Sequence, residues 1–381
     1  MTSDFKLIVF SGLGWMFDAM DVLILSYLLV AASKDLGLDT QARAIVVLAN
    51  NLGMLIGAIL FGRLSDRVGR RPVFMTTLLI YSVATALSAF SRTWPDLAIL
   101  RLIAGLGLGG ELPVVAAYVS ESSAPEKRGR NVVLLESFWS HGAIAAAAVS
   151  LFLFTSIGWR ASLLLLGLTA FYVFVIRRTL PESPAWATKA EARLTAELIR
   201  RAAVVSAVWF ALAFGYYGAF LWLPTILATE RGFTEVRTYQ FMFYTTLAQL
   251  PGYFSAAYLV EKIGRRPTAA AYFLASALAA LLFANSVSST ELFLWALALN
   301  FFNLGVWGVI YAYTPELFPT AVRGAAMGIA GSAARVGMII GPTLYPLIGI
   351  NAMAVIASLW ALAAALVYLL PETRHVQTRN L

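Results

Sequence analysis

A charged segment occurs twice in this chain of 381 residues, at a fixed spacing. Residues 62–72 read GRLSDRVGRRP and residues 257–267 read AYLVEKIGRRP, which places Gly69 and Gly264 195 positions apart. Two further charged positions repeat at the same spacing, Glu121 with Glu316 and Arg128 with Arg323. Repetition at one long period indicates a duplicated domain, so we expect the chain to fold as two homologous halves.

Composition places these halves in a membrane. Apolar residues make up 60% of the chain and charged residues only 13%. A soluble protein of this size could not cover that apolar content with polar surface. The net charge of +8 would suit nucleic acid in a soluble protein, but in a membrane protein it belongs to cytoplasmic loops. Cysteine is absent and histidine occurs twice, so we predict no metal site and no cofactor.

Twelve apolar runs are long enough to cross a hydrocarbon core of about 30 Å as helices. Six lie at 5–32, 41–62, 72–91, 95–120, 131–155 and 159–180. The other six lie at 202–229, 238–260, 267–286, 290–313, 322–346 and 350–370. The sequence therefore predicts an all-α integral membrane protein with six-helix halves at 1–180 and 202–381, joined by a cytoplasmic linker at 181–201. The chain enters its first apolar run almost at once, and no removable signal peptide is predicted.

The distribution of positive charge predicts the orientation. Alternate loops, together with the two termini, hold 20 of the 28 lysines and arginines, and the opposite loops hold six. Because positive residues are retained on the cytoplasmic side, both termini are predicted to lie in the cytoplasm.

Several motifs resemble those of the major facilitator superfamily. GRLSDRVGRRP is similar to the signature loop between its second and third helices, and RLIAGLGLGG at 101–110 resembles its fourth-helix motif. PESPAW at 181–186 and PET at 371–373 resemble the motifs that end its two halves. The resemblance covers essentially the whole chain. It implies a transporter of twelve helices that binds its substrate between two halves and works by alternating access.

Shorter motifs resemble particular branches of that superfamily. FDAMD at 17–21 is similar to the paired aspartates of the aromatic-acid:proton symporters. GGELP at 109–113, ESFW at 136–139 and TPELFP at 314–319 resemble the bacterial nicotinate-transporter and synaptic-vesicle/organic-ion branch. The predicted seventh helix lacks the glutamines and asparagine that sugar porters carry there, which argues against a sugar substrate.

The repeated charged loops are predicted to form a cytoplasmic gate. Glycine allows close backbone approach, and carboxylates paired with arginines can hold the gate shut until the halves rock. The alternative is that these charges only anchor the loops in the cytoplasm. The predicted gating residues are Asp66, Arg67, Arg70, Glu121, Arg128, Glu136, Glu316 and Arg323.

Arg335 is the most informative charge inside a predicted span. It lies 12 residues after Arg323, and therefore about 18 Å into the membrane. The surrounding GSAARVGMIIGP resembles the eleventh helix of organic-anion transporters, and a guanidinium can bind a carboxylate through two hydrogen bonds. The position 195 residues earlier is Ser140, so this charge breaks the repeat. We expect Arg335 to bind the carboxylate of the substrate, with a structural ion pair as the alternative.

Buried acids are the candidates for proton coupling. Asp18 and Asp21 are three residues apart and share one helix face, and Asp21 falls where the related sugar–proton symporters carry their protonatable aspartate. Glu111 lies about 15 Å beyond Arg101 along the fourth helix, and Arg101 is expected to brace that helix. His141 is a further candidate because histidine titrates near neutral pH. Each could instead serve helix packing, and Asp21 is slightly favoured.

Aromatic and amide side chains complete a predicted substrate site. Aromatic rings could stack on a flat substrate, and amides could bond a ring nitrogen or hydroxyl; packing and interfacial anchoring are the alternative roles. The substrate-binding candidates besides Arg335 are Tyr216, Tyr217, Trp307, Asn300, Asn303 and Gln249, with Trp222, Tyr244 and Tyr311 as further aromatic residues.

The sequence thus favours a monomeric transporter in the bacterial inner membrane that takes up a small organic monocarboxylate, such as nicotinate, with protons. An organic cation or a neutral solute bound by the acids is the alternative substrate, and a receptor that no longer transports is a third interpretation. An enzyme is not expected, because the chain shows no metal-ligand cluster, nucleotide-binding loop or GxSxG motif. Its expected partners are the small-molecule substrate, protons and the lipid bilayer, but not nucleic acid.

Overall fold

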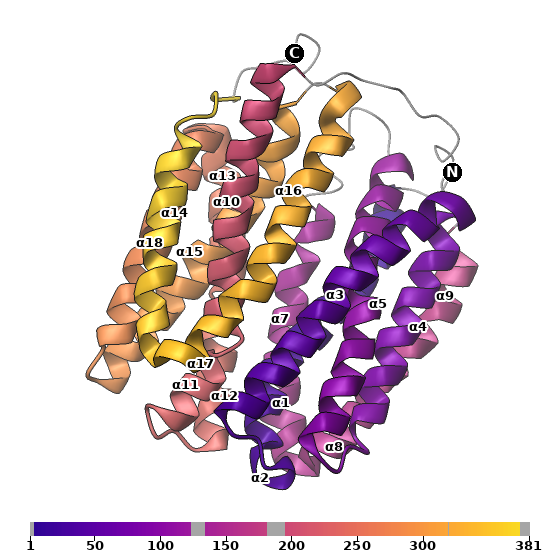
Figure 1. Cartoon of the computed structure of the whole chain (residues 1–381), viewed down its shortest axis with the longest axis vertical. Coiled ribbons are helices and arrows are strands. Elements are labelled where there is room, and N and C mark those ends of the chain that lie inside the picture. The colour runs from indigo at the N-terminus through magenta and orange to yellow at the C-terminus, as the bar shows by residue number, and fades with distance from the viewer. Residues whose placement is uncertain (1–3, 123–133, 181–194, 319, 374–381) are drawn as a thin grey trace. The chain divides into compact units, whose positions relative to one another are not determined.

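A computed structural model describes residues 4–122, 134–180, 195–318 and 320–373. Within these ranges the chain is helical and forms two compact units (Figure 1). The first unit comprises residues Met1–Thr188 and Leu223–Phe243, and the second comprises Lys189–Trp222 and Tyr244–Leu381. The predicted linker falls mostly on residues 181–194, outside the described part of the chain, so that boundary stays a prediction.

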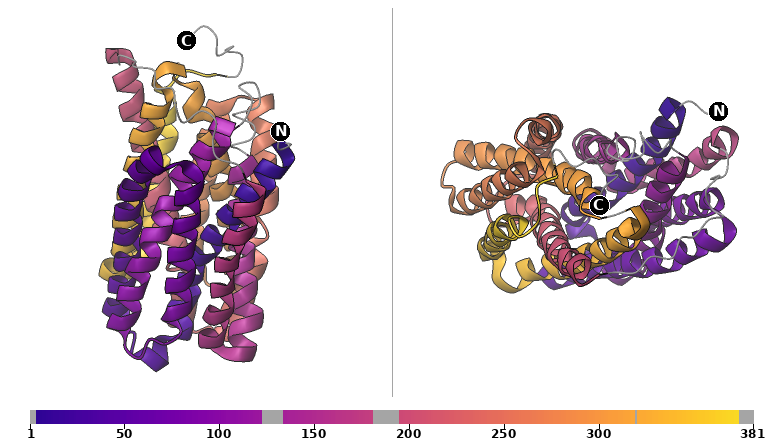
Figure 2. Two further views of the ribbon diagram at one scale, coloured as in Figure 1. Left: turned by 90° about the vertical axis from the view of Figure 1, so that its right-hand side faces the viewer. Right: turned by 90° about the horizontal axis from the view of Figure 1, so that it is seen from above.

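The first unit is a bundle of long helices whose axes run in roughly the same direction (Figures 1 and 2). Helix α3 packs on α5, α5 also packs on α4, and α1 lies against α7 and α5. A π-helical turn, Val149–Phe154, links α7 to α8. The helices are α1 (Asp4–Ala31), α2 (Ser33–Leu36), α3 (Thr40–Val68), α4 (Arg70–Ser88), α5 (Trp94–Ser122), α7 (Phe138–Ala148), α8 (Thr155–Leu166) and α9 (Tyr172–Thr179), with α11 (Leu223–Thr229) and most of α12 (Glu235–Thr246).

The second unit is a similar bundle, and its long helices also run in roughly one direction (Figures 1 and 2). Helix α10 packs on α16 and α18, while α14 packs on α15 and α18. Short 3-10 turns at Gly341–Thr343 and Gly349–Asn351 flank α17. The helices are α10 (Ala196–Phe220), α13 (Gln249–Lys262), α14 (Arg265–Asn285), α15 (Ser289–Glu316), α16 (Thr320–Ile340), α17 (Leu344–Ile348) and α18 (Ala352–Val367).

Local sequence explains where several helices begin. Ser288 caps α15: its hydroxyl accepts a hydrogen bond from the backbone N–H of Glu291, whose carboxylate in turn accepts from the backbone N–H of Ser288. Asp39 caps α3 by accepting from the backbone N–H of Ala42 at 2.7 Å. These side chains satisfy backbone donors that the first helical turn leaves open.

The described part of every predicted span is mostly helical, although several spans end or are interrupted in turns and some neighbouring spans join. Among the described residues, seven continuous helical stretches are long and apolar enough to cross a membrane. Two of them, Leu134–Ile176 and Ala326–Val367, each contain two predicted spans. In the first, the break between spans is a kink at Gly158, where φ is +81°, a value that glycine adopts without strain. The prediction of an all-α membrane protein is confirmed.

The sequence repeat is also a structural repeat. Gly69 (φ 111°, ψ 158°) precedes α4, and Gly264 (φ 106°, ψ 167°) precedes α14. Such angles are open to glycine but strained for residues that carry a Cβ atom. The arginine that follows points back across each turn, because Arg70 donates to the Ser65 hydroxyl at 2.6 Å and Arg265 to the Val260 carbonyl at 3.2 Å. The GRRP segments therefore make the same turn between successive helices.

Replacing Gly264 with alanine is expected to destabilise the protein. The new Cβ atom would lie 2.7 Å from the Glu372 carboxylate, and the positive φ alone costs about 1–2 kcal/mol. The temperature of thermal unfolding in detergent measures the effect. Gly328→Ala is the matched control, because a Cβ atom there meets nothing within 4 Å and α16 is helical at that residue. Equal unfolding temperatures for the two variants would contradict the prediction.

Candidate functional site

Arg335 lies on α16 of the second unit, 15 residues after the helix begins at Thr320. At 1.5 Å per residue this places its Cα about 22 Å along the helix, well inside a membrane span. Its side chain is partly exposed, and the phenols of Tyr311 and Tyr217 are among the groups that act on it electrostatically. A partly exposed guanidinium at this depth can bind an anion that enters the membrane-embedded part of the protein.

Aromatic rings surround these phenols. Trp307 and Tyr311 on α15 stack with their ring centres 5.9 Å apart and an interplanar angle of 28°. The Trp209 ring of α10 stands edge-on to Tyr311 at 4.7 Å and to Trp307 at 5.7 Å. Tyr216 approaches Trp307 at 5.7 Å. Together these rings and Arg335 combine apolar faces with one positive charge, as a flat aromatic anion requires.

The predicted amides lie on the same helix as Trp307 or next to it. The Gln249 side-chain amide of α13 donates to the side-chain oxygen of Asn300 at 2.8 Å, and the Asn300 side-chain amide donates to the Ala296 backbone carbonyl at 2.9 Å. Asn303 is fully buried, yet neither of its side-chain polar atoms has a hydrogen-bond partner. It lies one helical turn from Trp307 and shares its face of α15. A buried amide without partners is uncommon and is available to a ligand.

In the first unit, Asp21 belongs to a buried polar network. The Thr85 hydroxyl of α4 donates to one Asp21 oxygen at 2.6 Å, and the Arg101 guanidinium of α5 lies 3.6 Å from the other. Arg101 also donates to the hydroxyls of Thr85 at 2.7 Å and Ser88 at 3.1 Å. The expected bracing role of Arg101 fits this network, which joins α1, α4 and α5.

Asp18 and Glu111 are buried in the same unit without such partners. Their exposed fractions are 1% and 0%, and none of their four carboxyl oxygens has a hydrogen-bond partner. A Cβ atom placed on Gly14 would meet a Glu111 oxygen at 3.3 Å, so this carboxyl lies against α1 one turn before Asp18. Glu136, also buried, acts electrostatically on Asp18 and has the Trp15 indole nearby.

The two remaining candidates of the first unit, His141 and Arg67, are both exposed. The His141 ring nitrogen Nδ1 lies 3.1 Å from the Ser137 carbonyl, and its ring lies 5.6 Å from Phe138. The proposed roles of both residues remain predictions.

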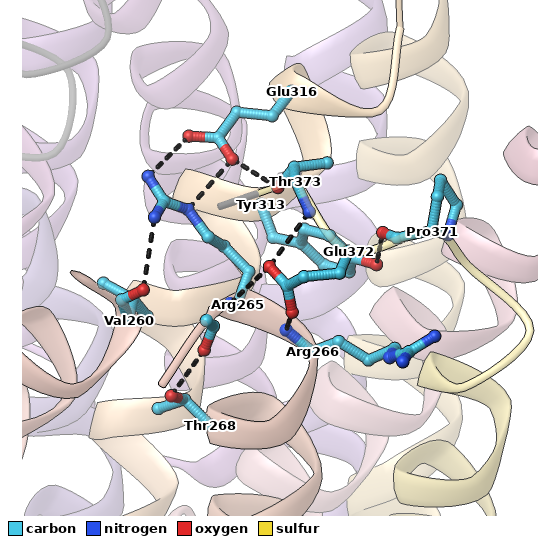
Figure 3. Close-up of polar contacts among 10 residues, drawn as sticks. Val260, Arg265, Arg266, Thr268, Tyr313, Glu316, Pro371, Glu372 and Thr373 are labelled. Atoms are coloured by element: carbon cyan, nitrogen blue, oxygen red, sulfur yellow. Dashed lines mark hydrogen bonds and ion pairs between the residues drawn. The ribbon is translucent and has the colours of Figure 1, made fainter. Parts of the chain in front are cut away.

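A polar cluster of the second unit contains the predicted gating residue Glu316 (Figure 3). The Glu316 carboxylate binds the Arg265 guanidinium through two bonds of 3.0 Å and accepts from the Thr373 hydroxyl at 2.5 Å. Glu372 accepts from the backbone N–H groups of Arg265 and Arg266, each at 2.9 Å, and thereby caps α14.

The same cluster includes Tyr313, whose hydroxyl donates to the Pro371 carbonyl at 2.6 Å. The PET motif is thus attached to the second GRRP turn and to the end of α15 (Figure 3). Four predicted gating residues cannot be compared with this arrangement: Arg128 and the side chains of Asp66, Glu121 and Arg323 lie outside the described part of the chain.

Sequence reasoning missed several residues of these sites, namely Thr85, Ser88, Trp209, Arg265 and Glu372. A weak signal existed for three of them. Thr85 and Ser88 are polar residues three apart on an apolar helix, and Trp209 lies seven residues before Tyr216, on the same helix face. Arg265 and Glu372 lie within recognised motifs, but the motifs alone do not predict the contact between these two residues.

Comparison with known proteins supports a transport function. The chain is 45% identical to the provisionally named niacin/nicotinamide transporter NiaP of Bacillus subtilis, over 89% of this chain and 87% of that relative. It is 39% identical to the niacin transporter NiaP of Acinetobacter baylyi, over 87% and 84% of the two chains. These relatives are transporters and not enzymes.

Solved structures show the same fold at low sequence identity. The Escherichia coli xylose transporter XylE superposes with a TM-score of 0.82 at 17% identity, over 99% of this chain and 100% of the other. The human organic anion transporter MFSD10 superposes with a TM-score of 0.79 at 17% identity, over 96% and 100%. The family model of the Major Facilitator Superfamily matches residues 11–256 and 241–381. With its duplicated loop, two helical units and these matches, the chain belongs to the major facilitator superfamily and is a multi-pass membrane transporter with that family's twelve-helix fold.

Proposed function

We propose that this protein takes up nicotinate, or a closely similar heteroaromatic monocarboxylate, by proton symport with alternating access. Two relatives that cover most of the chain are named as niacin transporters. The observation that carries the proposal is Arg335, which is partly exposed within a membrane span and is surrounded by phenols and stacked rings. A small aromatic anion needs both a positive charge and an apolar face.

In the proposed binding mode, Arg335 donates two parallel hydrogen bonds to the substrate carboxylate. The pyridine ring packs against Trp307, within the cluster that also contains Tyr216, Tyr217 and Tyr311. Asn303 donates its amide N–H to the ring nitrogen, which satisfies an amide that is otherwise buried without a partner. Asn300 and Gln249, which bond to each other, hold α13 and α15 in register beside it.

The repeated charged loops act as the cytoplasmic gate in this proposal. Within the second unit, the Arg265–Glu316 pair holds the second GRRP turn against the end of α15 and so supports the loop that contributes to this gate. We place the protein in the bacterial inner membrane as a monomer with both termini in the cytoplasm. The support for this orientation is the excess of lysine and arginine in one set of loops.

Uptake into proteoliposomes tests the proposal. Purified protein in liposomes with an alkaline interior is expected to accumulate radiolabelled nicotinate, and an uncoupler that abolishes the pH gradient should abolish accumulation. Labelled nicotinate should still exchange against internal unlabelled nicotinate without a gradient. Absence of both accumulation and exchange, in protein shown to be folded, would refute a nicotinate transporter.

An organic cation is the second candidate substrate, because the interior of the first unit holds the buried carboxyls of Asp18, Asp21, Glu111 and Glu136. Competition separates the two candidates. Benzoate should inhibit nicotinate exchange more strongly than benzylamine, which has a similar ring and the opposite charge. Inhibition by the amine alone would favour the cation.

Substitution of Asn303 is expected to reduce selectivity for the pyridine ring. Asn303→Leu removes one hydrogen bond to the ring nitrogen, which is worth about 1.4 kcal/mol, or about tenfold in nicotinate affinity. Benzoate has no ring nitrogen, so its inhibition constant in the same variant should change little and serves as the internal control. The measurement is competition against labelled nicotinate. Equal weakening of both ligands would show that Asn303 only supports the fold.

A further inference from the structure

We propose that the co-transported proton is held by Asp18 and Glu111 together, and that Asp21 is a positioning residue that carries no proton. The inference deepens the proposed proton symport and rests on it. It concerns only the first unit, where α1, α4 and α5 bring these three carboxyls into one interior.

Asp21 has partners that Asp18 and Glu111 lack, although its Oδ2 atom makes only an ion-pair contact and no hydrogen bond. It accepts from Thr85 and faces Arg101, which is itself completely buried and holds Thr85 and Ser88 as well. The ion pair balances one negative charge with one positive charge. A proton added to Asp21 would leave Arg101 as an uncompensated buried cation, so protonation there is opposed by the loss of the pair.

Asp18 and Glu111 are in the opposite situation. Both are buried, all four of their carboxyl oxygens lack hydrogen-bond partners, and the Glu111 carboxyl lies against the helix turn that precedes Asp18. Two ionised carboxyls in this interior would be two uncompensated like charges, which is a costly state. A proton bound to one of them removes one of the two like charges.

A third side chain, Tyr81, is suited to act as a hydrogen-bond donor at this proton site. Tyr81 of α4 is 1% exposed, its hydroxyl has no hydrogen-bond partner, and Glu111, Asp18 and Asp21 are the carboxyls that act on it electrostatically. In this structure its O–H bonds to neither carboxyl, and in the proposed cycle it turns to the carboxyl that is ionised after the proton leaves. The proposed proton site therefore has Tyr81 as its candidate hydrogen-bond donor in the unprotonated state.

The other titratable or charged groups around the pair do not supply the positive charge or the hydrogen bond that these carboxyls lack. Glu136 adds negative charge near Asp18, and the Tyr172 hydroxyl of α9 is used by the Phe10 carbonyl at 2.8 Å. The Arg101 guanidinium is committed to Asp21. Among the described residues, no group of three or more acidic or histidine side chains is arranged to hold a metal ion. A proton is therefore the cation that this carboxyl pair suits.

The proton balance of the cycle is simple. A proton from water on the acidic side of the membrane binds one oxygen of the pair, and the charge of this interior becomes less negative by one. On the alkaline side the same O–H bond breaks, the proton returns to water, and Tyr81 donates to the ionised carboxyl. No covalent chemistry or further reactant is required.

The test compares Asp18→Asn, Glu111→Gln and Asp21→Asn in proteoliposomes, with Glu230→Gln, an exposed carboxyl, as the matched control. With a gradient of one pH unit, symport of one proton supports accumulation of about tenfold. We expect this accumulation from the wild type and the control, but a ratio near one from Asp18→Asn and Glu111→Gln, which should still exchange nicotinate without a gradient. Accumulation in both of these variants, or its loss only in Asp21→Asn, would overturn the inference.

A measurement without substrate separates this inference from the proposed function. Infrared difference spectra of the protein between acidic and alkaline buffer report the carbonyl stretch of protonated carboxyls. The pair should contribute a band that Glu111→Gln removes and Asp21→Asn retains, even if the wild type does not transport nicotinate. Retention of every band in Glu111→Gln would refute the proton site. Size-exclusion profiles in detergent establish that each variant is folded.

Discussion

Replacing Arg335 with alanine should abolish nicotinate transport while the protein remains folded. The substrate carboxylate would enter a low-dielectric site without its positive partner, and removal of one member of a buried charge pair typically costs about 3–5 kcal/mol. This corresponds to a loss of binding of roughly two to three and a half orders of magnitude. Arg335 is partly exposed, so its loss should affect the fold less than it affects the bound carboxylate.

Arg335→Lys is the informative companion variant. Lysine keeps the charge but cannot form the two parallel hydrogen bonds of a guanidinium, so an intermediate loss of affinity is expected. Binding of labelled nicotinate to purified protein gives the dissociation constants, and uptake gives the transport rates. If Arg335→Ala and the wild type bound nicotinate with equal affinity, the substrate carboxylate would have to bind elsewhere. An unchanged unfolding temperature in both variants would exclude a general loss of structure.

The second large effect concerns stability. Arg101→Met should lower the free energy of unfolding by about 3–5 kcal/mol, because it leaves the Asp21 carboxylate buried without its cation. Methionine fills much of the same volume, so the loss is electrostatic more than steric. The measurement is thermal unfolding in detergent, with the exposed Arg92→Met as control.

A double variant shows whether the pair causes the effect. Asp21→Asn combined with Arg101→Met removes both charges, and Thr85 can still donate to the amide oxygen. Much of the lost stability should therefore return, as expected for coupled residues in contact. A double variant as unstable as Arg101→Met would mean that Arg101 acts mainly through Thr85 and Ser88.

The elements that could be predicted from the sequence are those set by length, hydrophobicity and repetition. The helices follow from apolar runs of a fixed minimum length, and the matching turns at Gly69 and Gly264 follow from the repeated GRRP. The joined stretch Leu134–Ile176 was harder to predict, because a single residue, Gly158, separates two spans. Hydrophobicity does not show whether so short an interruption is a loop or a kink.

The contacts between helices were harder to predict from the sequence. A helix that is apolar on all sides has no hydrophobic stripe, so its rotation relative to its neighbours cannot be read from the pattern. Asp18 and Asp21 share a helix face in the sequence, yet only Asp21 faces Arg101 and Thr85. The three-residue spacing made them equivalent candidates. Packing against α4 and α5 distinguishes them.

The attachment of Pro371–Thr373 has a practical consequence for protein production. Glu372 closes the start of α14, and Thr373 bonds to Glu316, so these three residues are part of the packed second unit (Figure 3). An affinity tag or a fluorescent reporter joined before Pro371 would remove them and leave backbone N–H groups of Arg265 and Arg266 without an acceptor. Fusion sites after Thr373 keep the second GRRP turn intact and are the ones to choose for expression.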